Sequence, residues 1–283
     1  MKLTAMSKGL TKLPQLEGAM NSYKEVNIFN NSFKHFPEAL IKMKNLEILN
    51  ISANQIDTIP SEIQQITQLK NIDFGHNQIR TIPETFFDLV NLQRYVYLHN
   101  NKIKELPDLF GKVPKIEYLN LSDNQLTKLP ESIGELKYLV ELRVMNNQLK
   151  DIPLSLAQLG NIRELYLRNN QIRTFKFDCS NWERLRILEL ESNQIQQFSL
   201  NFLRVKNLQR INLRHNKIER LPEDIGQASS LIELDLRSNE LKSLPETLLQ
   251  LVKLQRLDLR WNHELIIPNW IEDLRKQGCI VYY

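Results

Sequence analysis

The sequence predicts an α/β repeat solenoid, in which short coils of chain stack against one another with a parallel sheet on one face and short helices or 3-10 turns on the other. Three observations support this fold class. Asparagines recur every 23 residues, with one gap of 24 residues, and apolar residues and prolines keep fixed positions around them. Because a regular period of about 20 to 50 residues is the signature of stacked repeats, the core is expected to grow along one axis.

The repeated asparagines define eleven units from Tyr23 to Lys276. They are Asn31, Asn54, Asn77, Asn101, Asn124, Asn147, Asn170, Asn193, Asn216, Asn239 and Asn262. The unit at 46–68 shows the complete pattern, with apolar or proline positions at Leu46, Leu49, Ile51, Ile56, Ile59, Pro60, Ile63 and Ile66. Since a buried amide needs hydrogen-bond partners on both its carbonyl and its NH2 group, each asparagine is predicted to bridge backbone groups of adjacent units. The asparagines would then form a structural ladder.

The segment before each asparagine alternates apolar and polar residues with period two, which predicts a short strand whose leucines point inward. A proline then fixes φ as the chain enters the opposite side of the coil, and the apolar pair that follows, such as Ile133 and Leu136, suits a short helical turn. Strands pack about 4.8 Å apart, whereas the turns are bulkier, so the stack is expected to curve into a horseshoe with the sheet on its concave face.

This pattern resembles the leucine-rich-repeat family, in the 23-residue class of the intracellular Ras-associated and plant intracellular leucine-rich-repeat proteins. The resemblance rests on L-x-x-L-x-L-x-x-N-x-L-x-x-L-P-x-x-L-x-x-L-x-x, and it covers nearly the whole chain. It implies a horseshoe fold, an asparagine ladder, and roles in signalling or host interaction that the residues themselves do not show.

Three segments are predicted along the chain. Residues 1–22 read as a degenerate N-terminal repeat or cap, because their apolar residues keep the register but Lys8 occupies the asparagine position. Residues 23–276 hold the eleven repeats. In the C-terminal segment 277–283, Gly278 is expected to end the last helix and Cys279 to Tyr283 to form a capping strand. Tyr23, Phe33 and Phe36 are expected to lie under the weak first unit, unless that edge meets a second copy.

The 24-residue unit carries one surplus residue before Asn101. Because Val96 and Leu98 must be the inward pair, a bulge or widened loop is predicted near Arg94 or Tyr95. The insertion is either merely tolerated or serves to aim Tyr95 or Tyr97 at a partner.

Two units between 162 and 207 lack the proline, which is replaced by Lys176 and Ser199. Aromatic residues gather after their asparagines, at Phe175, Phe177, Trp182, Phe198 and Phe202. A better-filled, more helical convex core is predicted there, with a second binding surface as the alternative. Cys179 takes an inward apolar position and is expected to be a buried thiol.

The concave face is the predicted binding surface, because Tyr, Trp, Met and Arg are enriched at interface hot spots. One partner-binding patch is predicted at Tyr97, Tyr118, Arg143, Met145, Tyr166 and Arg168. A second is predicted at Arg214, Arg237, Arg260 and Trp261. For the second patch the alternative is a ladder of arginines and aspartates that satisfy one another across the strands.

No enzyme chemistry is predicted. The sequence lacks a glycine-rich phosphate loop, H-E-x-x-H and C-x-x-C, and every residue from 23 to 276 is assigned to a repeat. His76 and His99 lie near Asp73 and Asp123, but too few ligands converge for a metal site, so no metal and no cofactor are expected. The net charge of +4, from 37 basic and 33 acidic residues, is too small to indicate a nucleic-acid partner, and none is expected.

The expected function is that of a non-enzymatic scaffold for a protein partner of unknown identity, acting as a monomer or an edge-mediated homodimer. The alternatives are recognition of a glycan or lipid fragment by the concave aromatics, or a role as an interaction module of a larger signalling or effector assembly. With two cysteines, no apolar N-terminal stretch and no membrane-length apolar run, the chain is expected to be cytoplasmic, and secretion as an effector without an N-terminal signal stays open.

Overall fold

A computed structural model describes residues 1–178 and 181–283, and the chain divides into two compact units, Met1–Arg143 (unit 1) and Val144–Tyr283 (unit 2). The 23-residue pattern runs through this division without a break. Each unit has its own set of buried apolar residues.

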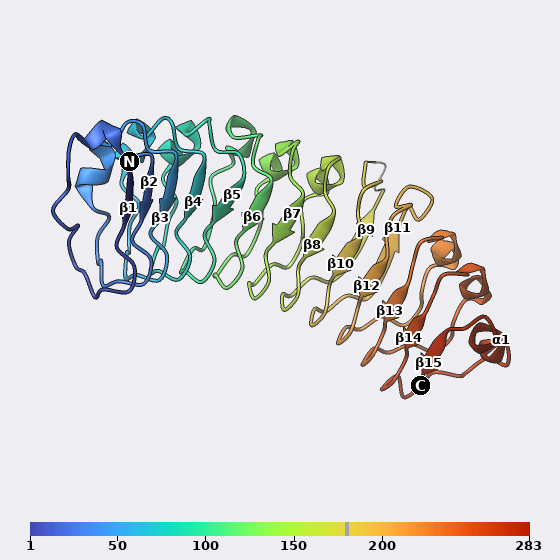
Figure 1. Cartoon of the computed structure of the whole chain (residues 1–283). Coiled ribbons are helices and arrows are strands. Elements are labelled where there is room, and N and C mark those ends of the chain that lie inside the picture. Colours follow the sequence, from blue (N-terminus) through green and yellow to red (C-terminus); the bar gives the residue numbers. More distant parts are fainter. Residues whose placement is uncertain (179–180) are drawn as a thin grey trace. The chain divides into compact units, whose positions relative to one another are not determined.

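Unit 1 is a stack of coils whose strands form one parallel sheet, with 3-10 turns on the opposite side (Figure 1). Its strands, in both chain order and sheet order, are β1 (Lys2–Thr4), β2 (Glu25–Asn27), β3 (Ile48–Asn50), β4 (Asn71–Asp73), β5 (Tyr95–Tyr97), β6 (Tyr118–Asn120) and β7 (Glu141–Arg143). Its 3-10 turns are η1 (Met20–Ser22), η2 (Glu38–Lys42), η3 (Ser61–Gln65), η4 (Glu84–Asp88), η5 (Phe110–Lys112) and η6 (Glu131–Glu135).

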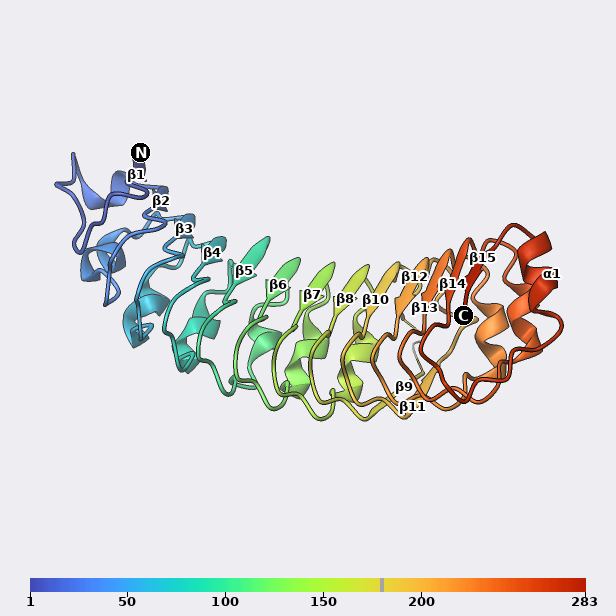
Figure 2. The ribbon, with the colours of Figure 1, turned by 90° about the horizontal axis from the view of Figure 1, so that it is seen from below.

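Unit 2 has the same plan, with the strands on one side and the turns on the other (Figure 2). Its main sheet contains β8 (Glu164–Tyr166), β10 (Ile187–Glu189), β12 (Arg210–Asn212), β13 (Glu233–Asp235), β14 (Arg256–Asp258) and β15 (Ile280–Tyr282). The opposite side carries η7 (Leu154–Gln158), β9 (Thr174–Phe177), β11 (Gln197–Leu200), η8 (Glu223–Gln227), η9 (Glu246–Gln250) and α1 (Ile271–Lys276).

The repeat period sets the strand register directly. In unit 1, Glu25 is opposite Ile48, and in unit 2, Arg210 is opposite Glu233, which is an offset of 23 residues in each case. The inward strand positions from Val26 to Leu259, such as Leu49 and Ile51, are buried between neighbouring coils. Because one coil cannot cover its own leucines, the stacking itself removes this apolar surface from water.

The turn after each strand is made by a residue in the left-handed region, immediately before the asparagine position. Twelve non-glycine residues adopt φ between 51° and 63° there, from Ser7 to Trp261. This conformation swings the chain inward, so the asparagine that follows points into the core.

The eleven asparagines lie in the core of their units and are no more than 9% exposed. Asn54 shows the arrangement, since its Nδ2 donates to the carbonyls of Ile51 (3.1 Å) and Ile28 (3.0 Å), while its Oδ1 accepts from the backbone N–H of Phe33 (3.1 Å). One side chain therefore bonds to its own coil and to the preceding coil, as the spacing predicts.

The predicted bulge lies at Arg94 and Tyr95. The Gln93 N–H still bonds to Lys70 O, an offset of 23, whereas Val96 pairs with Ile72, an offset of 24. The buried side chain of Asn71 accommodates the surplus residue, because its Oδ1 accepts from the Tyr95 N–H at 3.4 Å. Val96 and Leu98 are the inward pair, as expected.

The prediction of a more helical convex segment in the units without proline is wrong. Residues Thr174–Phe177 and Gln197–Leu200 are strands β9 and β11, which form a separate parallel pair. Lys176 is opposite Ser199 in this pair, and these are the two residues that replace proline. A proline has no N–H and cannot donate to a ladder, so its loss in two adjacent repeats permits the pairing.

The aromatic residues of this segment are buried, as predicted for a filled core. Phe175 and Phe198 stack with ring centroids 6.0 Å apart, and the Trp182 Nε1 donates to Leu156 O at 2.8 Å. Phe177 and Phe202 are also buried, which contradicts the alternative that these aromatics form a second binding surface. The prediction for Cys179 lies outside the described residues.

The two chain ends differ. In unit 2, Gly278 (φ 95°) ends α1, and β15 pairs with β14 as the capping strand was expected to do. The Arg275 Nη2 donates to Val281 O at 3.2 Å, so this carbonyl of the edge strand already has a hydrogen-bond partner within the chain.

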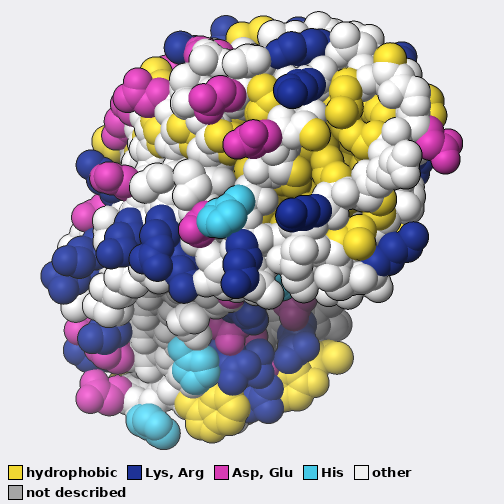
Figure 3. Space-filling view, turned by 90° about the vertical axis from the view of Figure 1, so that its left-hand side faces the viewer, with side chains coloured by type: hydrophobic (Ala, Val, Ile, Leu, Met, Phe, Trp, Pro, Cys, Tyr) yellow, Lys and Arg dark blue, Asp and Glu magenta, His cyan; other side chains and the backbone are white. Residues whose placement is uncertain are grey.

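In unit 1, β1 forms the edge, and Tyr23, Phe33 and Phe36 are buried beneath the first coil as expected. Hydrophobic side chains gather on the surface at this end of the unit (Figure 3), where Leu10, Leu13 and Leu16 are half-buried.

Candidate functional site

The side of the sheet that faces away from the core is lined by side chains in a regular pattern, and we call it the open face. In each repeat three side chains point to it: the first and third strand residues and the second residue after the strand, since period two places them on one side. In the repeat of β5 these are Tyr95, Tyr97 and His99, all half-buried, while Val96 and Leu98 between them are buried.

Sequence reasoning found two of the three positions and largely missed the first. The predicted patch includes Tyr118, but it omits Tyr95, Glu141, Glu164 and Arg256, which also begin their strands. The alternation of the strand could have identified this position. Successive side chains point to opposite faces, so the residues on both sides of an inward leucine must point outward.

Unit 1 carries an aromatic cluster on its open face. The ring centroids of Tyr95 and Tyr97 are 5.0 Å apart, and those of Tyr97 and His99 are 6.1 Å apart. His76 meets His99 edge-on at 4.9 Å, and Tyr118 is the cross-strand neighbour of Tyr95. The structure therefore brings together Tyr97 and Tyr118 of the predicted patch and adds Tyr95.

The residue opposite His99 shapes this cluster. A Cβ atom at Gly75 would come within 2.3 Å of the His99 Cε1, so the ring of His99 occupies space that only glycine leaves free. Glycine at this position thus leaves room for the imidazole ring beside the preceding repeat.

Burial also sets the charge state of the cluster. It raises the pKa of Tyr95 and Tyr97, and it lowers the pKa of His99 below its usual range even though Asp73 acts in the opposite direction. At neutral pH the two phenols and the imidazole are therefore uncharged.

The acidic residues around the cluster are not equivalent. Glu25 forms an ion pair with Lys2 at 2.7 Å, and Glu141 pairs with Arg143 of the predicted patch. Asp73 accepts the Gly75 N–H on its Oδ1 at 2.8 Å and takes part in no ion pair among the described residues. Its charge is therefore not compensated by a basic side chain in the described part of the chain.

Unit 2 holds the other three residues of the first predicted patch, Met145, Tyr166 and Arg168. The Tyr166 hydroxyl donates to Glu164 Oε2 at 2.7 Å. In the next repeat, burial raises the pKa of Glu189, whose Oε2 accepts from Asn212 Nδ2 at 3.0 Å. This part of unit 2 is polar and internally hydrogen-bonded.

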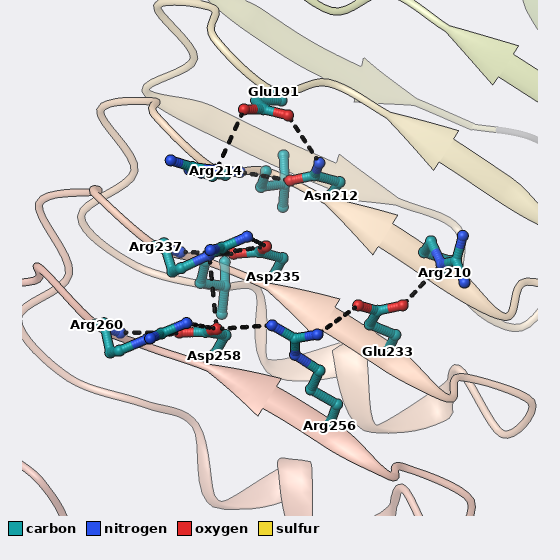
Figure 4. Close-up of polar contacts among 12 residues, drawn as sticks. Glu191, Arg210, Asn212, Arg214, Glu233, Asp235, Arg237, Arg256, Asp258 and Arg260 are labelled. Atoms are coloured by element: carbon teal, nitrogen blue, oxygen red, sulfur yellow. Dashed lines mark hydrogen bonds and ion pairs between the residues drawn. The ribbon is translucent and has the colours of Figure 1, made fainter. Parts of the chain in front are cut away.

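The last repeats of unit 2 form a network of arginines and carboxylates (Figure 4). Asp258 is fully buried and lies against three guanidinium groups. Arg260 donates its Nε to Oδ1 at 2.9 Å and its Nη2 to Oδ2 at 2.7 Å, Arg256 reaches Oδ2 at 3.2 Å, and the Arg237 Nε lies 3.6 Å from Oδ2.

The network continues on both sides of Asp258. The Arg237 Nε also donates to Asp235 Oδ1 at 2.9 Å. Glu233 lies between two arginines, with its Oε2 2.8 Å from the Arg210 Nε and its Oε1 3.6 Å from the Arg256 Nη1.

At the other edge of the network, the Arg214 Nη1 lies 3.7 Å from the Glu191 Oε1. Arg237 and Arg260 of the second predicted patch thus lie in the ladder of arginines and aspartates that the sequence left open as the alternative, whereas the buried Arg214 Nε has no hydrogen-bond partner among the described residues. Binding of these arginines to a partner stays a prediction.

The pairing of Asp258 has an electrostatic consequence. Burial by itself raises the pKa of this carboxyl, but the hydrogen bonds from Arg260 and Arg256 outweigh it, so the pKa is lower than usual. Asp258 is ionised at neutral pH, and the guanidinium groups around it are compensated within the molecule.

Trp261 is the outlying member of the second patch. It is 51% exposed and holds φ at 63°, where the equivalent residues are Asn, Ser, His, Asp or Ala. The Arg260 guanidinium lies 5.5 Å from its ring centroid and 5.0 Å from that of Tyr282. A left-handed conformation costs a bulky side chain about 1–2 kcal/mol, so this is a locally strained, exposed aromatic residue.

Metal sites and membrane spans have specific structural requirements. Among the described residues, no group of three or more His, Cys, Asp or Glu side chains could hold a metal ion. Within the same part of the chain, no helix has the length and apolar character needed to cross a bilayer.

Comparisons with known proteins agree with this architecture. The family model described as Leucine rich repeat matches residues 45–103 and 94–149, and the model described as Leucine-rich repeat region matches residues 162–276. No curated protein matches the chain in sequence.

Solved structures resemble the chain over most of its length. A leucine-rich-repeat protein of Leptospira interrogans is 29% identical with a TM-score of 0.65, and the alignment covers 97% of this chain and 82% of that one. The plant peptide hormone receptor RGFR1, in complex with RGF2, is 24% identical with a TM-score of 0.83, covering 100% of this chain and 47% of the receptor. Toll of Drosophila, in its complex with Spatzle, is 24% identical with a TM-score of 0.77, covering 92% of this chain and 38% of that one.

Proposed function

Because this chain is a leucine-rich-repeat protein, we propose that it is a non-enzymatic scaffold that binds a protein partner through the open face of its sheet. The observation that carries the proposal is the aromatic cluster of unit 1. Tyr95 and Tyr97 are half-exposed and lie 5.0 Å apart on one strand, with Tyr118 on the next strand. Tyrosines held on a rigid sheet offer large contact area at little entropic cost, which is why they dominate interface hot spots.

Two of the similar structures support a ligand-binding role by analogy. RGFR1 is a peptide hormone receptor whose structure holds RGF2, and Toll is seen in complex with Spatzle. For this chain, a role in signalling is part of the proposal.

The proposal is tested by affinity capture from the native cell, followed by quantitative mass spectrometry. The bait with Tyr95→Ala and Tyr97→Ala is compared with wild type and with Tyr138→Ala. Tyr138 is 57% exposed and lies outside the strand positions of the open face, so it controls for loss of an exposed tyrosine.

We expect a partner that is recovered with wild type and Tyr138→Ala but reduced at least about tenfold with the double variant, since truncating hot-spot residues costs about 2 kcal/mol or more. Thermal unfolding confirms that the double variant is folded. If every captured protein is recovered equally by all three baits, the open face of unit 1 is not the binding surface.

A second candidate is an interaction module within a larger assembly. It is favoured by coverage, because the chain spans 47% of RGFR1 and 38% of Toll. Native mass spectrometry of material from its source separates the two. A chain mass of 33.4 kDa supports an independent scaffold, and a larger covalent chain supports the module.

A further inference from the structure

Asp73 stands out on the open face of unit 1 because its charge is not compensated. The other two acids that begin or end a strand on this face, Glu25 and Glu141, each pair with a basic side chain. Asp73 uses Oδ1 to accept the Gly75 N–H and leaves Oδ2 without a hydrogen bond or ion pair among the described residues. A carboxylate in this position attracts a cation from outside the chain.

The surroundings of Asp73 are aromatic. It is the cross-strand partner of Tyr97, whose ring centroid lies 5.0 Å from that of Tyr95 and 6.1 Å from that of His99. Its carboxylate adds to the raised pKa of both tyrosines and opposes the lowering of the His99 pKa by burial. None of these three neighbours carries a charge at neutral pH that could neutralise the carboxylate. The corner therefore combines one negative charge with the rings of two tyrosines.

The hydrogen bond to Gly75 does not require a charged residue. In the equivalent position, Asn27, Asn50 and Asn120 accept the N–H of the second residue along in the same way, at 3.0–3.2 Å. An amide oxygen therefore makes the same hydrogen bond in this turn, and the fold does not require the negative charge of Asp73.

We propose that Asp73, Tyr95 and Tyr97 form a subsite for a cationic side chain of the protein partner, an arginine before a lysine. The inference rests on the proposed function and specifies the chemistry that the open face of unit 1 recognises. The carboxylate pairs with the charge, and the tyrosine rings accept it over their faces, where the ring quadrupole is negative. Arginine fits better than lysine because its planar guanidinium stacks on a ring while still donating to a carboxylate.

The test uses two small probes, N-acetylarginine amide and N-acetylcitrulline amide. The citrulline side chain has nearly the same shape and no charge. Each is titrated into the full chain labelled with 13C on the tyrosine rings, and the NMR signals of Tyr95 and Tyr97 are assigned from single Tyr→Phe variants.

We expect the signals of Tyr95 and Tyr97 to shift with the arginine probe and to stay in place with the citrulline probe. Asp73→Asn keeps the acceptor for the Gly75 N–H, so the variant folds as wild type, and it weakens arginine binding about two- to fivefold, the effect of one partly exposed charge. Asp57→Asn is the matched control, because it removes the same charge from the neighbouring repeat outside the open face and leaves binding unchanged.

Equal shifts with both probes, no shift at either tyrosine, or equal affinities for wild type and Asp73→Asn would overturn the inference. These results leave the capture experiment untouched, since a partner lost from the Tyr95→Ala and Tyr97→Ala bait still supports binding by the open face. Loss of arginine binding in Asp73→Asn together with equal capture by all baits would reject the proposed function instead.

Discussion

The open faces of the two units use the same strand positions in different ways. In unit 1 these positions hold tyrosines, a histidine and the uncompensated carboxylate of Asp73. In unit 2 the last repeats fill them with arginines and acids that pair with one another, and the side chain of Arg237 is only 19% exposed. An arginine on a sheet face is therefore not in itself evidence of a partner site, because its charge can be paired with an acidic side chain of the same chain.

This difference gives the two faces different physical roles. Removing one member of a buried ion network is expected to affect folding, because the remaining charges lose their partner. Removing a half-exposed tyrosine is expected to affect binding more than folding. Substitutions in both units test this division, in order of expected effect.

The largest effect is expected for Asp258→Ala in unit 2. The substitution leaves Arg256 and Arg260 without their shared carboxylate, and breaking a buried pair in this way costs about 3–5 kcal/mol. Urea unfolding followed by circular dichroism measures the loss. Asp73→Ala in unit 1 is the comparison, and similar midpoints for the two variants would contradict the assignment of roles.

The lowered pKa of Asp258 predicts how the stability of the fold depends on pH in acid. Because the folded-state pKa of Asp258 lies below its usual value, its contribution to stability is complete above about pH 4 and is lost as the pH falls through the folded-state pKa. Asp258→Asn should remove this component of the acid response, which stability curves between about pH 2 and pH 5 measure. An unchanged slope would show that another group carries it.

The next effect is expected for the ladder itself, through Asn124→Ala in unit 1. The change leaves the buried Ile103 N–H without its hydrogen-bond partner, whereas Leu98 O still accepts from Asn101 Nδ2, so the expected cost is about 1–3 kcal/mol. Thr127→Ala, an exposed position in the same repeat, is the control. Equal unfolding midpoints for the two variants would show that the ladder contributes nothing to stability.

The smallest effect on folding is expected for Gly75→Ala. The new methyl displaces the His99 ring at a cost of about 1 kcal/mol, because a side chain can move where backbone cannot. Binding should suffer more than stability, since the ring packs beside Tyr97. A variant that unfolds much more readily but still captures the partner fully would contradict this.

Much of the fold could be predicted from spacing alone. The asparagines at 23-residue intervals determine the strand register, and the one interval of 24 places the bulge beside Arg94. These features depend on local patterns that repeat, so each unit supports the interpretation of the others.

The convex segment of the proline-free repeats could be predicted only in part. The alternation of Thr174, Phe175, Lys176 and Phe177 has the period of a strand, but pairing required a second proline-free repeat in register at Ser199. Burial of the aromatics followed from composition, whereas their secondary structure depended on contact between two coils.

The candidate site was less accessible to sequence reasoning. Composition indicated tyrosines and arginines on one face, but not which charges are paired. Asp73 and Asp258 are the same residue type in the same strand position, and only the neighbouring strands decide that one lacks a cation among the described residues and the other contacts three. The partner and the cytoplasmic location stay predictions, because both depend on more than the fold.

The central claim is that the open face of unit 1 contacts the partner, and site-specific photo-crosslinking tests it most directly. A benzoylphenylalanine at Tyr118 is on this face, and one at Tyr138 is 57% exposed but lies elsewhere on the same unit. Irradiation in the native cell should give one crosslinked partner from position 118 and none from position 138. The same partner from position 138 alone would contradict the claim.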